Sequence, residues 1–243
     1  MESTFVVSGA GTGIGRAVAT RLARDGRHVT AVGRRREPLE AVQGAVNGHV
    51  DVVVADVSTE SGAAAVAEQI RSAGHGCAGV VAAAGGISPS GGSLSEVRQD
   101  WQAAFESNVL TAVLLVEALR PQLDANAGRV VLLSSVAALR GSGGGPYGAM
   151  KAALHAWVFD LARDLGAHGG TANVVAPGFV PDTEFWAGRL SDESRAQRAA
   201  QTLVGRAGTP DEVAGLIGWL LGPDGGWVTG QILSPNGGVV LGR

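Results

Sequence analysis

Short apolar segments rich in valine recur along the chain, separated by segments with a helical repeat. The apolar segments lie at residues 4–8, 28–33, 50–55, 79–84, 129–134 and 171–176, with a weaker seventh at 231–235. Most are continuously apolar and do not alternate with polar residues. This pattern is typical of strands that are buried on both faces of a parallel sheet.

The segments between these strands carry the period of amphipathic helices. They cover residues 14–25, 60–72, about 95–125, 148–166 and 211–221, and a further helix is expected to begin near Pro38. Strands that alternate with helices predict βαβ units and a doubly wound α/β sheet. No linker or repeat interrupts the pattern, so we expect one domain over residues 1–243.

One segment, residues 179–209, has no strand before the next helix. It begins with the aromatic residues Phe179, Phe185 and Trp186 and continues as a polar stretch. A surface excursion of this length is often a lid over a binding site. We therefore expect a substrate lid here, with the three aromatic side chains as substrate contacts.

Composition narrows the classes of function. Hydrophobic residues make up 45% of the chain, which suits a sizeable core, and the net charge of -3 argues against binding nucleic acid or an anionic membrane. The single Cys77 excludes an internal disulfide and gives no metal-ligand cluster, so we expect no metal and a reducing cytoplasm. No apolar run reaches the ~18 residues of a membrane span, and the N-terminus does not resemble a signal peptide.

A glycine-rich turn, SGAGTGIG at residues 8–15, joins the first predicted strand to the first predicted helix. Gly9, Gly13 and Gly15 allow a tight turn in which backbone N–H groups approach a pyrophosphate, and the helix dipole adds to this attraction. The spacing is G-x-x-x-G-x-G and not G-x-G-x-x-G. The turn, with Ile14, predicts a dinucleotide site. An ordinary loop is the alternative, because the chain contains 38 glycines.

The residues after the second predicted strand bear on the choice of cofactor. Gly33 is followed by Arg34, Arg35 and Arg36, and no acidic residue occurs before Glu37. NAD sites usually place an acidic residue here, whereas NADP sites place an arginine. Three cations also oppose the dipole of the next helix, and a bound 2′-phosphate would offset them. We predict NADP(H), held by Arg34 and Arg35, with NAD(H) as the alternative; a solvated basic turn is the other interpretation.

Tyr147 and Lys151 are the only tyrosine and the only lysine of the chain, since 18 of its 19 basic residues are arginines. Four positions apart on a predicted helix, they lie on the same face. An ordinary tyrosine has a pKa near 10, and a nearby ammonium lowers it. The pair is therefore suited to proton transfer in alcohol/ketone chemistry. A surface pair without a role is the alternative.

Two serines, Ser134 and Ser135, end the predicted strand at 129–134. The carboxyl end of a parallel strand is where α/β sheets bind ligands. A hydroxyl at that place can donate a hydrogen bond to a carbonyl oxygen and stabilise charge on it.

Together these motifs resemble the short-chain dehydrogenases/reductases that consist of a single Rossmann domain, and the resemblance covers almost the whole chain. The matching positions are Gly9, Gly13 and Gly15; Asp56-Val57; Ala84-Gly85; Asn108; Ser135; Tyr147 to Lys151; Asn173 to Gly178; Gly208 to Val213; Val228 to Gln231; and the turn that starts at Asn236. The resemblance implies a three-layer doubly wound Rossmann fold around a mostly seven-stranded parallel sheet.

The resemblance also implies roles for four residues. Tyr147 would be the acid/base, and Lys151 would bind the nicotinamide ribose and lower the pKa of Tyr147. Ser135 would polarise the substrate carbonyl. Asn108 would hold a water that links Lys151 to solvent, although a helical asparagine satisfied by backbone groups would look the same in sequence. The implied cofactor contacts are Asp56 and Val57 with adenine, Gly85 with the adenosine ribose, and Pro177, Gly178 and Val180 beside the nicotinamide.

The chain departs from the family pattern in three places. The usual N-N-A-G is Ala82 to Gly85, so an amide that braces the sheet is missing, and we expect some loss of local rigidity without loss of chemistry. The usual D-G-G is N-G-G. The interval from Ser135 to Tyr147 is one residue short, which leaves Ser134 and Ser135 both open; the following Val136-Ala137 favours Ser135.

These inferences predict an NADP(H)-dependent oxidoreductase that interconverts a ketone and a secondary alcohol, with a specialised or lipid-like small molecule as substrate. One alternative is a 3-oxoacyl-[acyl-carrier-protein] reductase, although the only concentrated basic run for an acidic carrier is Arg34–Arg36. A non-catalytic NADP-sensing protein is another. The family resemblance implies a homo-oligomer built on the 95–125 and 148–166 helices and the C-terminal strand. A tetramer is favoured over a dimer.

Overall fold

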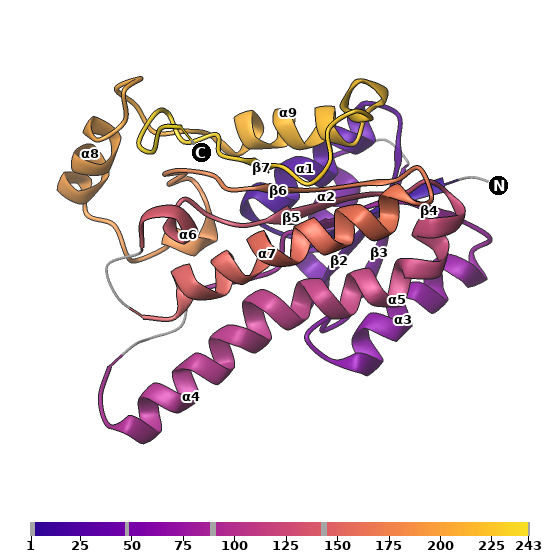
Figure 1. Cartoon of the computed structure of the whole chain (residues 1–243), viewed down its shortest axis with the longest axis horizontal. Coiled ribbons are helices and arrows are strands. Elements are labelled where there is room, and N and C mark those ends of the chain that lie inside the picture. Colours follow the sequence, from indigo (N-terminus) through magenta and orange to yellow (C-terminus); the bar gives the residue numbers. More distant parts are fainter. Residues whose placement is uncertain (1–2, 47–48, 88–90, 142–144, 243) are drawn as a thin grey trace.

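The computed structural model describes residues 3–46, 49–87, 91–141 and 145–242. Within them, seven parallel strands form one sheet in the order β3-β2-β1-β4-β5-β6-β7 (Figure 1). The strands are β1 (Ser3–Ser8), β2 (His28–Gly33), β3 (Val50–Val54), β4 (Gly76–Ala82), β5 (Arg129–Leu133), β6 (Thr171–Val175) and β7 (Ile232–Leu233). The predicted doubly wound fold is confirmed, with β4 beginning three residues earlier than expected and β7 reduced to two residues.

Helices connect successive strands and lie on both sides of the sheet. They are α1 (Gly13–Arg24), α2 (Arg36–Gly44), α3 (Glu60–Ser72), α4 (Leu94–Phe105), α5 (Thr111–Ala125), α6 (Ala137–Arg140), α7 (Tyr147–Gly166), α8 (Asp192–Ala200) and α9 (Pro210–Leu220). Three short turns of other helix types add η1 (Glu106–Leu110), η2 (Glu184–Trp186) and η3 (Pro223–Gly225).

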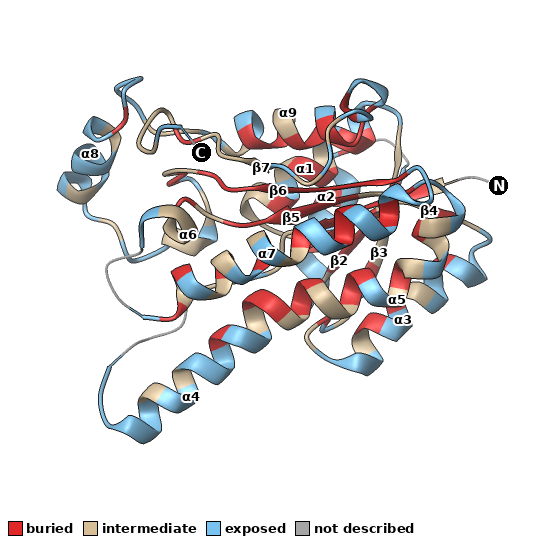
Figure 2. Ribbon diagram, viewed as in Figure 1, coloured by how far each residue is buried: buried red, intermediate tan, exposed pale blue. Residues whose placement is uncertain are grey.

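The core consists of two apolar layers, one on each face of the sheet. On β1, Val6 faces the layer formed with α3, α5 and α7, and its neighbour Val7 faces the layer formed with α1, α2 and α9. Successive side chains of a strand point to opposite faces. Because both faces are covered, both sets of side chains are apolar, and Figure 2 shows the strands as buried.

The strand order places a topological switch point between β1 and β4. The chain leaves β1 toward β2 and β3, then crosses back to β4 on the other side. Helices from the two halves diverge there, and the crevice outside the carboxyl ends of the strands is where such sheets bind ligands. The glycine-rich turn follows β1, so the fold itself sets the turn at this crevice.

The predicted helix at 95–125 is one continuous 32-residue helix, Leu94–Ala125. Judged by length and composition only, it is long and apolar enough to cross a membrane. Its second half, α5, buries Leu115, Leu119 and Leu123 against the sheet, which is the placement of a core helix. Its first half, α4, projects beyond the sheet (Figure 1), and Trp101 and Phe105 there are exposed. The π-turn η1 joins the two halves.

Candidate active site

The carboxyl ends of the strands border a cleft of about 810 Å³. The cleft runs from the glycine-rich turn at Gly9 and Gly13, past Asp56, to Tyr147 and Lys151. One continuous cavity therefore joins the predicted phosphate-binding turn to the predicted reacting groups. Its size suits a dinucleotide together with part of a substrate.

The glycine-rich turn has the geometry of an anion site. Gly9 and Gly13 have φ angles of 66° and 52°, in the left-handed region that favours glycine. A Cβ on Gly15 would lie 2.2 Å from the carbonyl oxygen of Gly9, so no larger residue fits. The N-cap residue Thr12 makes no side-chain capping bond to α1, whereas Thr59 caps α3 in this way. The first N–H groups of α1 are thus open to a phosphate.

Two of the three consecutive arginines face the cleft. Arg34 and Arg35 line it, while Arg36 begins α2, slightly earlier than expected, and pairs with Glu40 at 3.5 Å. The guanidinium of Arg35 donates a hydrogen bond of 2.6 Å to Glu184, which lies in the 179–209 segment. Sequence reasoning missed Glu184, because the pair spans 149 positions of the chain.

Asp56, directly after β3 and Ala55, is held in place through one of its carboxylate oxygens. That oxygen accepts hydrogen bonds from the Ser58 backbone N–H at 3.0 Å and the Ser58 hydroxyl at 2.7 Å. These bonds, and to a lesser extent the charge of Arg34, hold the pKa of Asp56 below its usual value. Asp56 is therefore an ionised acceptor at the cleft, and the buried Val57 beside it supplies an apolar wall.

The loop after β4 is braced by a residue that sequence reasoning missed. The hydroxyl of Ser8, at the end of β1, accepts hydrogen bonds from the N–H groups of Ala83 and Ala84 at 3.1 and 3.2 Å. The Thr111 hydroxyl donates to the carbonyl of Ala84 at 3.5 Å. These two hydroxyls hold the alanine-containing loop, where the family pattern has asparagine side chains.

Gly85 brings the loop against two predicted catalytic residues. A Cβ on Gly85 would lie 2.7 Å from Oδ1 of Asn108 and 2.9 Å from Nζ of Lys151. Any side chain here would displace one of them. The absence of a side chain at Gly85 is thus what lets the loop, Asn108 and Lys151 meet.

Asn108 lies in the π-turn η1 and is buried. Its Oδ1 accepts a hydrogen bond from the Gly86 N–H at 3.1 Å, and its Nδ2 donates to the Gly86 carbonyl at 2.9 Å and the Ala104 carbonyl at 3.1 Å. The side chain therefore ties the helix to the loop after β4 and is not satisfied by its own helix alone. π-turns change the direction of helix carbonyl groups and are frequent at functional sites.

The two serines after β5 have different surroundings. Ser134 is buried, donates a hydrogen bond of 3.0 Å to the carbonyl of Lys151, and lies 2.8 Å from Nε2 of His155. Both serines border the cleft, but Ser135 is the more exposed, and its side chain acts on the Tyr147 hydroxyl in the direction that lowers the pKa of Tyr147. The geometry thus favours Ser135 as the serine that meets a substrate, and gives Ser134 a structural place under α7.

Tyr147 and Lys151 share one face of the first turns of α7, with Nζ 5.9 Å from the centre of the tyrosine ring. Lys151 is buried, and its ammonium donates a hydrogen bond of 2.9 Å to the carbonyl of Leu133. Burial lowers the pKa of Lys151 to about 8 and raises the pKa of Tyr147 to about 12, while the Ser135 side chain acts in the lowering direction. In the protein without a bound cofactor, burial therefore raises the pKa of Tyr147 by more than its neighbours lower it.

The 179–209 segment closes the cleft from one side. Phe185 and Trp186 line the cleft, and Phe185 packs on Tyr147 with ring centroids 5.4 Å apart. Phe179 is not among the residues that border the cleft, so its predicted role as a substrate contact stays a prediction. It supports Trp186 from behind in an edge-to-face contact at 5.5 Å, and Arg198 stacks on both rings.

The segment after β6 forms the wall beside the reacting end. Pro177, Gly178 and Val180 line the cleft there, as expected for contacts with a nicotinamide. A Cβ on Gly178 would lie 2.7 Å from Cα of Asn236, so the N-G-G turn packs directly on this wall. Ile14 lines the opposite end beside the glycine-rich turn.

Comparison with known proteins identifies the family of the chain. The family described as "Enoyl-(Acyl carrier protein) reductase" matches residues 9–240. The short-chain reductase protein NovJ from Streptomyces niveus is 34% identical, covering 98% of this chain and 94% of its own length. The chain belongs to the short-chain dehydrogenase/reductase family. Further relatives include the 3-oxoacyl-[acyl-carrier-protein] reductase FabG of Escherichia coli (strain K12), 31% identical over 97% of this chain and 96% of its own.

The solved structures include a mutant of a short-chain dehydrogenase/reductase from Serratia marcescens. It superimposes with a TM-score of 0.87 at 30% identity and covers 98% of this chain and 97% of its own. As a member of this family, the protein with the present sequence is an oxidoreductase that acts on CH–OH or C=O groups and uses an NAD(P)(H) cofactor. The open N-terminus of α1 and the glycine cradle fit the pyrophosphate of such a cofactor.

Replacement of Lys151 by methionine should raise stability at pH 7. The folded protein holds this ammonium at a pKa of about 8, against 10.5 for the ordinary group, so between these values the unfolded chain binds the extra proton. Stability therefore rises with pH from about 8 to 10.5, and the buried charge costs about 3 kcal/mol below pH 8. The variant also loses the hydrogen bond to the Leu133 carbonyl, which offsets part of this gain. We therefore expect the Tm of Lys151→Met to increase by about 4–8 °C.

Thermal unfolding followed by circular dichroism measures this difference. Lys151→Arg is the matched control, because it keeps the charge and should not stabilise. A Tm of Lys151→Met equal to or below that of the wild type at pH 7 would contradict the assignment of a destabilising buried charge.

Proposed function

We propose that this protein is an NADP(H)-dependent reductase that converts a ketone to a secondary alcohol, with Tyr147 as proton donor. The observation that supports it most directly is that Ser135, Tyr147 and the buried Lys151 border one cleft with the open N-terminus of α1. We propose that the protein is cytoplasmic, because its single Cys77 is buried and forms no disulfide.

The proposed mechanism assigns each residue one task. A bound nicotinamide cofactor supplies the hydride for the carbonyl carbon. Ser135 donates a hydrogen bond to the carbonyl oxygen and stabilises the developing charge, and Tyr147 transfers its proton to that oxygen. Lys151 would hold the ribose of a bound cofactor and would return a proton to Tyr147 through a water held beside Asn108.

The pKa directions suit the reducing direction. With its pKa raised to about 12 by burial, Tyr147 stays protonated at neutral pH and is ready to donate. Lys151, with a pKa of about 8, is mostly charged at pH 7 and can pass on a proton. Both groups thus begin the reduction in the required protonation state.

Replacement of Tyr147 by phenylalanine tests the proton donor. The variant should lower kcat for NADPH-dependent ketone reduction by about 10²–10⁴-fold, because the ring remains but the proton is lost. The Kd for NADPH should change less than about tenfold, since at most one hydrogen bond is removed. Stopped-flow fluorescence and steady-state kinetics separate the two. Turnover near the wild-type rate would exclude the mechanism.

The two adjacent serines provide an internal comparison. Ser135→Ala should lower kcat by about 10²–10³-fold, as expected for loss of a donor to the carbonyl oxygen. Ser134→Ala should keep kcat within about tenfold and lower Tm, because Ser134 bonds only structural groups. Kinetics and thermal melts on both variants measure the contrast. The opposite ranking of kcat would assign the role to Ser134.

The cofactor preference is assigned to Arg34 and Arg35. Both line the cleft after β2, where a 2′-phosphate would lie, and no acidic residue of that turn competes for a ribose hydroxyl. Glu184 neutralises Arg35 across the cleft. We propose that the phosphate takes over this pairing when NADP(H) binds.

Single arginine variants distinguish a phosphate site from a general basic surface. Arg35→Ser should raise KM for NADPH about tenfold, from one lost phosphate contact of about 1.4 kcal/mol, and leave KM for NADH nearly unchanged. Arg36→Ser is the matched control, since Arg36 pairs with Glu40 outside the cleft. Steady-state kinetics with both cofactors measure the effect. Equal losses for the two variants, or wild-type activity greater with NADH, would contradict the NADP assignment.

For the substrate, we propose an apolar ketone of a specialised or lipid-like class. Phe185 and Trp186 give the reacting end of the cleft an aromatic wall, and Arg189 stands at its edge. The alternative, reduction of a 3-oxoacyl group on a carrier protein, is favoured by the similarity to FabG. A panel of cyclic ketones, aliphatic ketones and 3-oxoacyl thioesters, assayed with NADPH, decides between them.

We propose a homo-oligomer, with a tetramer favoured over a dimer. Large apolar side chains are exposed on three helices, with Trp101 and Phe105 on α4, Phe159 on α7 and Trp219 on α9. Contiguous exposed apolar surface often marks an interface, and Trp101 and Phe105 border one shallow hollow on α4. Size-exclusion chromatography with light scattering should give a mass near four chains, and a monomer at micromolar concentration would contradict the proposal.

A further inference from the structure

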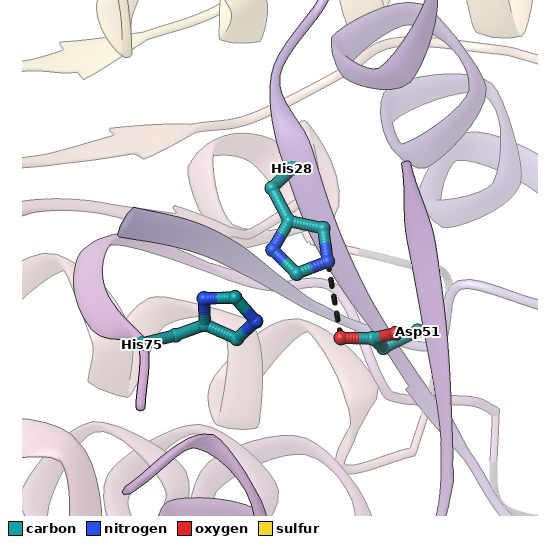
Figure 3. Close-up of side chains that lie close together, drawn as sticks. All are labelled: His28, Asp51 and His75. Atoms are coloured by element: carbon teal, nitrogen blue, oxygen red, sulfur yellow. Dashed lines mark ion pairs between the residues drawn. The ribbon is translucent and has the colours of Figure 1, made fainter. Parts of the chain in front are cut away.

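A cluster of metal-ligand side chains lies at the amino ends of the strands, opposite the cofactor cleft. His28 is the first residue of β2, Asp51 lies in β3, and His75 directly precedes β4. Each offers one ligand atom, and the three atoms lie within 4.8 Å of one another. Figure 3 shows the side chains converging from three separate segments of the chain.

The three residues are far apart in the sequence, and the fold brings them together. Asp51 pairs in register with Thr30, two residues after His28, so the His28 and Asp51 side chains project from the same face of the sheet. The chain leaves α3 through Gly74, with φ of 74°, and the His75 N–H bonds the Ile70 carbonyl at 3.1 Å. This turn sets the His75 ring 4.4 Å from the His28 ring.

The distances fit the first coordination shell of a zinc ion. Nε2 of His28 and Oδ2 of Asp51 are 3.0 Å apart. Two ligands of a tetrahedral Zn²⁺ with bonds of about 2.0–2.1 Å are separated by about 3.3 Å. The ligand atom of His75 lies within 4.8 Å of the other two and needs to approach by at most about 1.5 Å. The Asp51 side chain is 51% exposed, which leaves it room to rotate toward His75.

Hydrogen bonding leaves the imidazoles with unused capacity. The Nδ1 atoms of His28 and His75 are buried and have no hydrogen-bond partner among the described residues. Among the described residues, neither nitrogen of the His75 ring makes a hydrogen bond. Buried polar atoms are rarely left without partners. The His28–Asp51 contact uses Nε2 of His28, and His75 only packs edge-on against the His28 ring. A cation shared by the three ligand atoms would give His75 a bonding partner as well.

We propose that His28, Asp51 and His75 bind one Zn²⁺ ion per chain, with water as the fourth ligand on the exposed side of Asp51. Two imidazole nitrogens and one carboxylate oxygen suit zinc, whereas Mg²⁺ and Ca²⁺ prefer oxygen ligands throughout. The ion links β2, β3 and the turn before β4. It binds the folded chain, where the ligands meet, and therefore stabilises the fold.

Zinc titration of the untagged, EDTA-dialysed full-length protein tests the proposal. Isothermal titration calorimetry should give one equivalent of Zn²⁺ with a Kd at or below about 10 µM. Saturating Zn²⁺ should raise Tm by about 5–10 °C, and the same concentration of Mg²⁺ should not. A wild-type protein that shows no saturable zinc binding overturns the proposal.

Variants locate the binding. His75→Gln and Asp51→Asn should each weaken zinc binding at least about tenfold and reduce the Tm increase, because each removes one ligand. His168→Gln, which removes an exposed histidine elsewhere, is the matched control and should bind as the wild type does. Zinc binding retained in both ligand variants, or lost instead in His49→Gln, would overturn the assignment.

Folding and catalysis are checked in the same variants. In EDTA their circular dichroism spectra should match that of the wild type; if His75→Gln fails to fold, the half-exposed Asp51 keeps the test available through Asp51→Asn. NADPH-dependent ketone reduction should continue in the ligand variants, because the cluster lies at the other end of the strands from the cleft. The zinc proposal is independent of the proposed function, since its readouts are zinc binding and Tm.

Discussion

Burial of the parallel sheet on both faces is the constraint on which the rest of the structure depends. Val6 and Val7 point into opposite apolar layers, and the same holds along the other central strands. Polar side chains are expensive inside either layer, so they collect where the strands end. At the carboxyl ends this concentrates Asp56, Ser135 and the glycine-rich turn around one cleft, and at the amino ends it leaves the cluster of His28, Asp51 and His75.

The same burial gives the site its electrostatic character at a cost in stability. Lys151 is enclosed beneath the loop after β4, with the Leu133 carbonyl as its hydrogen-bond acceptor. A buried ammonium without a carboxylate partner destabilises a fold, and its low pKa records that cost. In exchange, the ammonium is held at a fixed place beside Tyr147 and Asn108. The site is thus preorganised by packing, with Gly85 leaving the necessary space.

The short turn η2 connects the two ends of the cleft. The Thr183 side chain, just before η2, lies beside Gly13 of the phosphate-binding turn. Glu184 pairs with Arg35 near the adenosine end, and Phe185 packs on Tyr147 at the reacting end. Contacts of the 179–209 segment therefore involve both the cofactor-binding and the reacting groups. The expected lid at residues 179–209 stays a prediction, and these contacts are its physical basis.

The sequence by itself determined the order of strands and helices, the glycine-rich turn and the spacing of Tyr147 and Lys151, because these depend on local periodicity and backbone conformation. Tertiary structure decided what depends on long-range packing. It buried Ser134 under α7 and left Ser135 more exposed, joined the Ala83 and Ala84 N–H groups to Ser8, and packed Phe179 against Trp186. It also brought His28, Asp51 and His75 together. Such contacts join residues far apart in the chain, and only the strand order and register fix the distances between them.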